Sequence, residues 1–326
     1  MNIQVPKASY KPQAGTKSFA SHRESWFDVE HRAACALDAV LSHEYYGDAL
    51  PCYFPNLGPD IFSAYFGTEL DFGENTSWSH ASLEDWSEVA KIEFSESNVY
   101  WQKTVALTKA LLEAGRGNFY TGLTDLHPGG DAVAAFRDPM NLGIDMIENK
   151  EEVKNLLFKL EADYFKIYDT FYETLRAARQ PLTSWIGMYG PGKFYIPSND
   201  FSCMISKESF DEIFLPGIVR ECRFLDQSIY HLDGPGALQH LDSLLSIEEL
   251  DAIQWVYGAG AGPLSRWFEV YKRCQDAGKG IQVYCNTKEL DTVIENLSPK
   301  GVWLGVHGVK NGEEAKAILQ RIERWR

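Results

Sequence analysis

Two polar residues end a buried segment near the middle of the chain. His231 and Asp233 are two positions apart in SIYHLDGPG, so on a strand their side chains leave the same face. Imidazole and carboxylate groups are zinc ligands, and a catalytic zinc site has three protein ligands and one open position. Cys285 and His307 end two later apolar segments and complete a predicted metal set of His231, Asp233, Cys285 and His307. The alternative is a hydrogen-bonded pocket without metal, in which Asp233 fixes a turn and Cys285 is a small buried apolar residue.

Other polar residues have spacings that suit acid–base chemistry. Asp125 and His127 precede Pro-Gly-Gly, and a carboxylate–imidazole pair there could transfer protons or only shape the turn. Asp200, in a loop before a predicted helix, is the third catalytic candidate. Arg137 could bind a substrate anion bidentately or form a structural ion pair.

Three further residues are predicted to line a substrate pocket together with Asp233 and Arg137. Tyr189 ends one segment, and Gln254 and Trp255 lie side by side on another. An indole wall with one amide would recognise a small ligand. For Trp255, the alternative is ordinary core packing.

Buried apolar segments that alternate with helical periodicity predict the frame that would position these residues. This alternation is typical of a parallel sheet, and eight such units predict a single (β/α)8 barrel, whose active site lies at the C-terminal ends of the strands. No GxGxxG motif follows the first strand, which disfavours an open nucleotide-binding sheet. The predicted strands are 49–56, one within 57–75, 117–125, 183–190, 228–233, 252–258, 280–285 and 301–308. The predicted helices are 24–43, 101–114, 149–179, 207–225, 236–245, 264–277, 287–296 and the C-terminal segment from 310.

Domain organisation follows from composition along the chain. Residues 1–22 are polar and predict a loose N-terminal arm, and residues 23–326 predict the barrel domain. The segment 57–100 is rich in loop-forming and aromatic residues, and it is expected to fold over one end of the barrel.

Charge and composition exclude several functional classes. The 326 residues include 46 acidic and 31 basic side chains, for a net charge of −15. This charge repels nucleic acids and anionic membrane surfaces, and no apolar run approaches the length of a bilayer-spanning helix. Six cysteines without a CxxC pair or a signal peptide predict a cytoplasmic protein with reduced thiols. The oligomeric state stays open.

The segments NDFSCMISKESFDEIFLPGI, YHLDGPG, AIQWVYGAG and GVWLGVHG resemble the uroporphyrinogen decarboxylase superfamily over most of residues 117–326. The superfamily includes zinc-dependent methylcobamide:coenzyme M methyltransferases, and the resemblance implies a (β/α)8 barrel with its site at the strand C-termini. In those methyltransferases a His-x-Cys and a later Cys bind zinc. His231 matches the histidine, Asp233 replaces the first cysteine, and His307 lies in the region of the second.

The resemblance also bears on the reaction. The decarboxylases carry an arginine motif near the N-terminus that binds tetrapyrrole carboxylates, whereas residues 49–60 contain no arginine. Unpaired substrate carboxylates in a cleft are costly, so tetrapyrrole decarboxylation is not expected. The resemblance instead implies methyl transfer between a small substrate and a cobalamin-bearing corrinoid protein, with zinc as cofactor. The alternatives are a metal-assisted lyase or hydrolase and a non-catalytic barrel that binds a small ligand.

Overall fold

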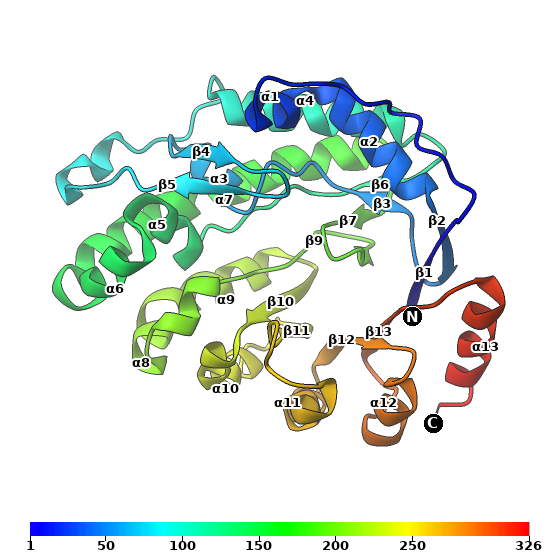
Figure 1. Cartoon of the computed structure of the whole chain (residues 1–326). Helices are drawn as coiled ribbons and strands as arrows, with labels where there is room; N and C mark the ends of the chain where they lie inside the picture. Colours follow the sequence, from blue (N-terminus) through cyan, green and yellow to red (C-terminus); the bar gives the residue numbers. More distant parts are fainter. Residues whose placement is uncertain (326) are drawn as a thin grey trace.

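The structure is a computed structural model that describes residues 1–325, and a mixed α/β fold built on one large sheet emerges from it (Figure 1). The seven strands follow the order β2-β1-β13-β12-β11-β10-β9, and all neighbours are parallel except β1 and β2. Its strands are β1 (Asn2–Pro6), β2 (His43–Gly47), β9 (Phe194–Tyr195), β10 (Gln227–Asp233), β11 (Ala252–Val256), β12 (Gly280–Asn286) and β13 (Val302–His307).

Six further strands form three separate two-stranded pairs. One pair is parallel and two are antiparallel. They are β3 (Cys52–Tyr53) with β6 (Tyr120–Thr121), β4 (Glu69–Phe72) with β5 (Ser77–His80), and β7 (Leu182–Thr183) with β8 (Tyr189–Gly190).

Helices surround the sheet on the outside of the molecule, and the two termini lie near each other (Figure 1). The longest helix, α7, buries a mainly apolar face from Val153 to Leu175, which also includes Glu161. The α-helices are α1 (His22–Phe27), α2 (Val29–Leu41), α3 (Ile61–Ala64), α4 (Val99–Ala114), α5 (Gly130–Arg137), α6 (Pro139–Glu148), α7 (Lys150–Ala177), α8 (Lys207–Ser209), α9 (Leu215–Phe224), α10 (Leu241–Leu245), α11 (Phe268–Asp276), α12 (Leu290–Asn296) and α13 (Gly312–Ile322). Shorter turns are the 3-10 helices η1 (Trp86–Lys91), η2 (Asp200–Met204), η4 (Pro235–His240) and η5 (Leu264–Trp267), and the π turn η3 (Phe210–Phe214).

The predicted alternation of strands and helices is confirmed from residue 227 onward, but closure of the barrel is not. Within residues 1–325 no ladder joins the edge strands β2 and β9. The predicted strands 49–56, 117–125 and 183–190 are wrong in extent, because only two residues of each of β3, β6 and β7 pair. A chain reversal between Thr183 and Tyr189 makes β7 and β8 antiparallel, so 183–190 is not one strand.

The N-terminal prediction also needs correction. Residues 2–6 are not a loose arm, because β1 pairs with both β13 and β2 and buries Ile3 and Val5. The alternation in Asn2–Pro6 is that of a strand with one apolar face. The predicted helix 24–43 is two helices, since Asp28 ends α1 and its carboxylate accepts a hydrogen bond from the His31 backbone at the start of α2.

The strand predicted within 57–75 lies outside the central sheet, where β4 and β5 form a hairpin. Pro59, Asp60 and Ser79 from this part of the chain line a cavity that is described below, whereas the closed barrel whose end the segment was expected to cover is not confirmed. No helix among residues 1–325 has both the length and the apolar character needed to cross a membrane.

Candidate functional site

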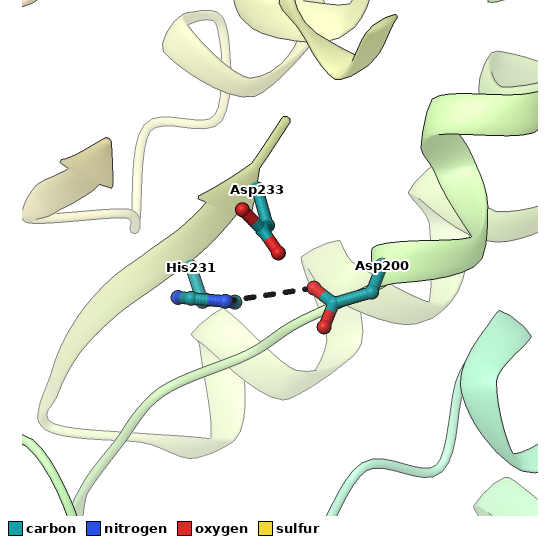
Figure 2. Close-up of side chains that lie close together, drawn as sticks. All are labelled: Asp200, His231 and Asp233. Carbon is teal, nitrogen blue, oxygen red and sulfur yellow. Dashed lines mark ion pairs between the residues drawn. The ribbon is translucent and has the colours of Figure 1, made fainter. Parts of the chain in front are cut away.

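Asp200, His231 and Asp233 place one ligand atom each within 4.8 Å of one another (Figure 2). The Nε2 atom of His231 lies 3.6 Å from Oδ1 of Asp200. Two ligands of one tetrahedral ion are about 3.4 Å apart if each bond is roughly 2.1 Å, so this pair already has a suitable spacing. The group offers one nitrogen and two oxygen donors, which fit a divalent cation.

Strand pairing holds His231 and Asp233 in place. His231 pairs with Gln254 in the register of β10 with β11, so the two side chains share a face. The His231 Nδ1 atom lies 2.6 Å from Oε1 of Gln254. With the ring hydrogen donated to this amide, the Nε2 lone pair faces the two carboxylates, as in the outer hydrogen bonds that orient metal-binding histidines. Gly234 has a φ of 79°, and this left-handed residue turns the chain directly after Asp233.

Asp200 comes from the loop at the start of η2, and Asp131 secures that loop. The Asp131 carboxylate accepts backbone hydrogen bonds from Asp200 at 3.0 Å and from Phe201 at 2.8 Å. The Asp200 side chain is 54% exposed on its open side. Partial burial raises its pKa above the ordinary value; the charge of His231 opposes this shift and that of Asp233 adds to it. A cation bound here would relieve the repulsion between the carboxylates.

The group borders a cavity of about 550 Å³, which we call the acidic cavity. No lysine or arginine lines it among the described residues. Its lining residues are Phe54, Pro59, Asp60, Ser79, Asp125, His127, Asp131, Ala134, Ala135, Pro139, Trp185, Asp200, Phe201, Met204 and His231. The cavity therefore combines four carboxylates with aromatic walls, and its volume suits a small ligand.

Asp125 and His127 both line this cavity, so the structure brings all three predicted catalytic residues together. Burial raises the pKa of Asp125 to about 7. Burial and the nearby charge of His231 lower the pKa of His127 to about 3, which leaves the imidazole neutral. The His127 Nε2 atom is buried without a hydrogen-bond partner in the described structure. Burial and the charge of Asp200 raise the pKa of Asp131 to about 7, although its backbone hydrogen bonds oppose the shift.

Two residues of the predicted metal set lie elsewhere. Cys285 pairs with Val306, whereas His231 and Gln254 occupy the opposite face of the sheet, so the Cys285 thiol points into the core on the helix side. Burial raises its pKa to about 12, so it is a protonated thiol. His307 shares the face of His231 by register but ends β13, three strands from β10, and lines a second cavity. The predicted four-residue set is therefore not assembled.

Three of the predicted substrate contacts are also absent. Trp255 lies on the helix side and packs edge-on against Trp267 at 5.3 Å, which is the core alternative. Arg137 donates to Asp145 at 2.5 Å and to the Leu83 and Glu84 carbonyl groups, so it forms a structural ion pair. Tyr189 is 51% exposed and lines neither cavity.

Sequence reasoning missed several residues that form the site. Asp131 was visible only as a carboxylate after Pro-Gly-Gly, and Asp60 and Trp185 belong to no motif. The Trp185 ring meets the His231 ring edge-on at 5.2 Å. Such contacts depend on how distant loops meet, and no local pattern indicates them.

Comparisons with known proteins support the fold. No protein-family model matches the chain, and no curated protein sequence is significantly similar to it. Among solved structures, the chain resembles a methyltransferase from Methanosarcina mazei, with a TM-score of 0.60 and 10% identity over 93% of this chain and 88% of that one. The likeness is one of fold. Membership of the uroporphyrinogen decarboxylase superfamily therefore stays a prediction.

Proposed function

We propose that this protein is a methyltransferase-like enzyme that moves a methyl group between a small substrate and a cobalamin-bearing corrinoid protein. The observation that carries the proposal is the Asp200–His231–Asp233 group at the edge of the acidic cavity. The fold shared with a solved methyltransferase supports it. The six cysteines are all free, which agrees with the proposed cytoplasmic location.

The three residues of this group would hold a divalent metal, with zinc as the first candidate. Bound there, the metal would act as a Lewis acid that polarises the substrate atom that gains or loses the methyl group. Two carboxylates and one imidazole form a harder donor set than a thiolate site, so manganese or ferrous iron also suits these ligands. The Gln254 amide keeps the His231 ring oriented for ligation.

Asp125 and His127 would serve the substrate directly. A carboxyl group with a pKa of about 7 exchanges its proton near neutral pH, so Asp125 suits the general acid–base role. His127 is neutral, and its uncharged imidazole would form part of the wall that the substrate meets. Phe54, Trp185 and Phe201 would exclude water from the reacting groups.

The charge of the cavity limits the substrate class. Asp60, Asp125, Asp131 and Asp200 line it without a lysine or arginine among the described residues. Anionic substrates would meet repulsion there, and neutral or cationic ones would not. We therefore propose a small uncharged or cationic substrate, and uroporphyrinogen turnover is not expected.

Metal binding is the first test. The purified protein, stripped with chelator, is titrated with zinc by calorimetry, alongside the variants His231→Gln and Asp233→Asn. The exposed pair His80 and Asp71 provides matched controls, His80→Gln and Asp71→Asn, which change the same residue types outside the cavity. We expect one tight zinc equivalent in the wild type and both controls, weakened at least about tenfold in the site variants.

Methyl transfer is the second test. Metal-loaded protein is mixed with methylcobalamin and small thiols or amines, and formation of the demethylated corrinoid is followed by absorbance. Metal binding with transfer that His231→Gln abolishes supports the proposal. The assay is repeated with any corrinoid protein that a pull-down recovers. If metal binds but no methyl group is transferred in either assay, a metal-assisted lyase or hydrolase is favoured. Absence of both contradicts the proposal and favours a non-catalytic binding role.

A further inference from the structure

A second cavity, of about 560 Å³, opens beside the C-terminal ends of β1 and β13. We call it the neutral cavity, because none of its lining residues is aspartate, glutamate, lysine or arginine. Its polar residues include Asn2, Gln4, His43 and His307, and Tyr284 and Trp185 give it aromatic walls. Its composition is thus opposite in character to that of the acidic cavity.

The Asn2 side chain is a polar group in the wall of the neutral cavity. Asn2 is only 8% exposed, and its side chain forms no hydrogen bond with any described residue. A Cβ atom at Gly187, which also lines the cavity, would lie 3.9 Å from the Asn2 Nδ2 atom. The amide is reached from the cavity and has no partner among the described residues, so a ligand that pairs with both its oxygen and its nitrogen would form two hydrogen bonds there.

Strand geometry brings further hydrogen-bonding groups beside Asn2. Asn2 pairs with Gly305 across β1 and β13, so Asn2, Gln4 and His307 share one face of the sheet. Gln4 and His307 are exposed and form no side-chain hydrogen bond within the described part of the chain. His43 uses its Nδ1 atom toward Ser42 and Ala39, which leaves Nε2 available to a ligand.

The aromatic walls favour a flat ligand. The Tyr284 ring lies directly over Gly305, where a Cβ atom would come within 2.5 Å of the ring. Trp185 contributes an indole to the lining of both cavities. Planar rings stack on such surfaces, and amide side chains pair with the donor–acceptor edge of a nucleobase or carboxamide.

We propose that the neutral cavity binds an uncharged planar ligand that carries an amide-like donor–acceptor edge, such as a nucleobase or an aromatic carboxamide. The ligand's edge pairs with Asn2, Gln4 and His307, and its ring packs between Tyr284 and Trp185. Because Trp185 also contacts His231, this ligand lies next to the candidate metal group. The inference does not depend on methyl transfer, since binding is measured without metal or turnover.

Three flat probes of nearly equal size test the proposal. Benzamide is neutral, benzoate is anionic and benzamidine is cationic, and adenine provides a second neutral planar edge. Saturation-transfer NMR on the full chain in the presence of chelator measures the affinity of each. We expect benzamide and adenine to bind with dissociation constants in the millimolar range or tighter, and benzoate not to bind.

Variants then locate the binding site. Gln4→Met and His307→Leu change exposed side chains at strand ends and are expected to fold; Asn2→Leu is buried and is compared only if its urea midpoint matches the wild type. The matched controls are Gln102→Met, an exposed glutamine of α4, and His22→Leu, an exposed histidine of α1. We expect benzamide and adenine to bind at least about tenfold more weakly to Gln4→Met and His307→Leu, and unchanged to the controls.

Several results would overturn the proposal. One is the absence of saturation transfer to both neutral probes. Another is equal affinity for benzamide and benzoate. A third is neutral-probe binding that Gln4→Met and His307→Leu leave unchanged. Benzamidine binding that survives these two variants belongs to the acidic cavity and does not count as support. None of these results bears on the zinc titration, so the two proposals fail separately.

Discussion

Replacing Arg137 by Met is expected to destabilise the protein without touching either cavity. Arg137 Nε lies 2.5 Å from Oδ2 of Asp145, whose side chain is only 2% exposed. Without the guanidinium, Asp145 keeps the Asn149 amide at 2.7 Å and the Trp86 indole at 3.3 Å, but its charge has no counter-ion. Loss of one partner from a buried ion pair costs about 3–5 kcal/mol of folding free energy. We expect a loss in this range.

Equilibrium urea unfolding, followed by tryptophan fluorescence, measures the effect. A double-mutant cycle compares the wild type with Arg137→Met, Asp145→Leu and the double variant. In the double variant both charged side chains are replaced by apolar ones. Because apolar replacement of a whole buried pair is often neutral, the double variant should recover most of the stability lost by Arg137→Met.

The dependence on pH gives an independent check. Burial raises the pKa of Asp145, but hydrogen bonds from Arg137, Asn149 and Trp86 outweigh it and hold the pKa below the ordinary value of 3.8. A carboxyl group of this kind stabilises the fold above pH 3.8, and the contribution is lost as the pH falls through the lower folded-state pKa. The destabilisation caused by Arg137→Met should therefore shrink in strong acid. A loss below about 1 kcal/mol at neutral pH, or single-variant effects that simply add, would refute the reasoning.

Two further predictions concern the acidic cavity and the cysteines. Burial raises the pKa of Asp125 to about 7, so the folded state holds a proton that the unfolded state releases near pH 4. The protonated carboxyl group stabilises the fold at low pH, and this contribution is lost as the pH rises from about 4 through 7. In metal-free buffer at pH 8, the free energy of unfolding of Asp125→Asn in urea should therefore exceed that of the wild type by on the order of 1–3 kcal/mol. Near pH 4 the two proteins should be equally stable. Equal stability at both pH values would show that Asp125 titrates normally. Partial burial and the charges of Asp200 and Asp233 raise the pKa of Cys203, but its thiol is exposed, whereas Cys285 is buried with its pKa raised to about 12. Iodoacetamide should therefore alkylate Cys203 faster than Cys285, with or without zinc. Peptide mass spectrometry measures the labelling of each cysteine. If Cys285 reacts without zinc and is protected when zinc is added, the prediction is wrong and Cys285 is a zinc ligand.

Local sequence determined the strands and helices of the C-terminal part of the chain and the shared face of His231 and Asp233. The β10 to β13 strands are long apolar segments bounded by helices with clear periodicity, so their positions follow from the chain alone. The spacing of His231 and Asp233 fixed their shared face before any tertiary contact was known, because side chains alternate along a strand. Asp125 and His127 also line one cavity, but they lie beyond β6, so strand alternation does not account for their meeting there.

Tertiary structure decided which of these residues meet. Asp200 joins the metal group only because Asp131, far away in the sequence, binds its loop. His307 has a side chain that can bind a metal, and it shares the sheet face of His231. However, β13 lies three strands away from β10, so His307 lines the neutral cavity instead. Whether Cys285 faced the site depended on the register of β12 against β11 and of β11 against β10, and a shift of one residue reverses every side chain of a strand. Local pattern fixes periodicity and face, whereas register, loop packing and the distance between strand ends arise from contacts between remote parts of the chain.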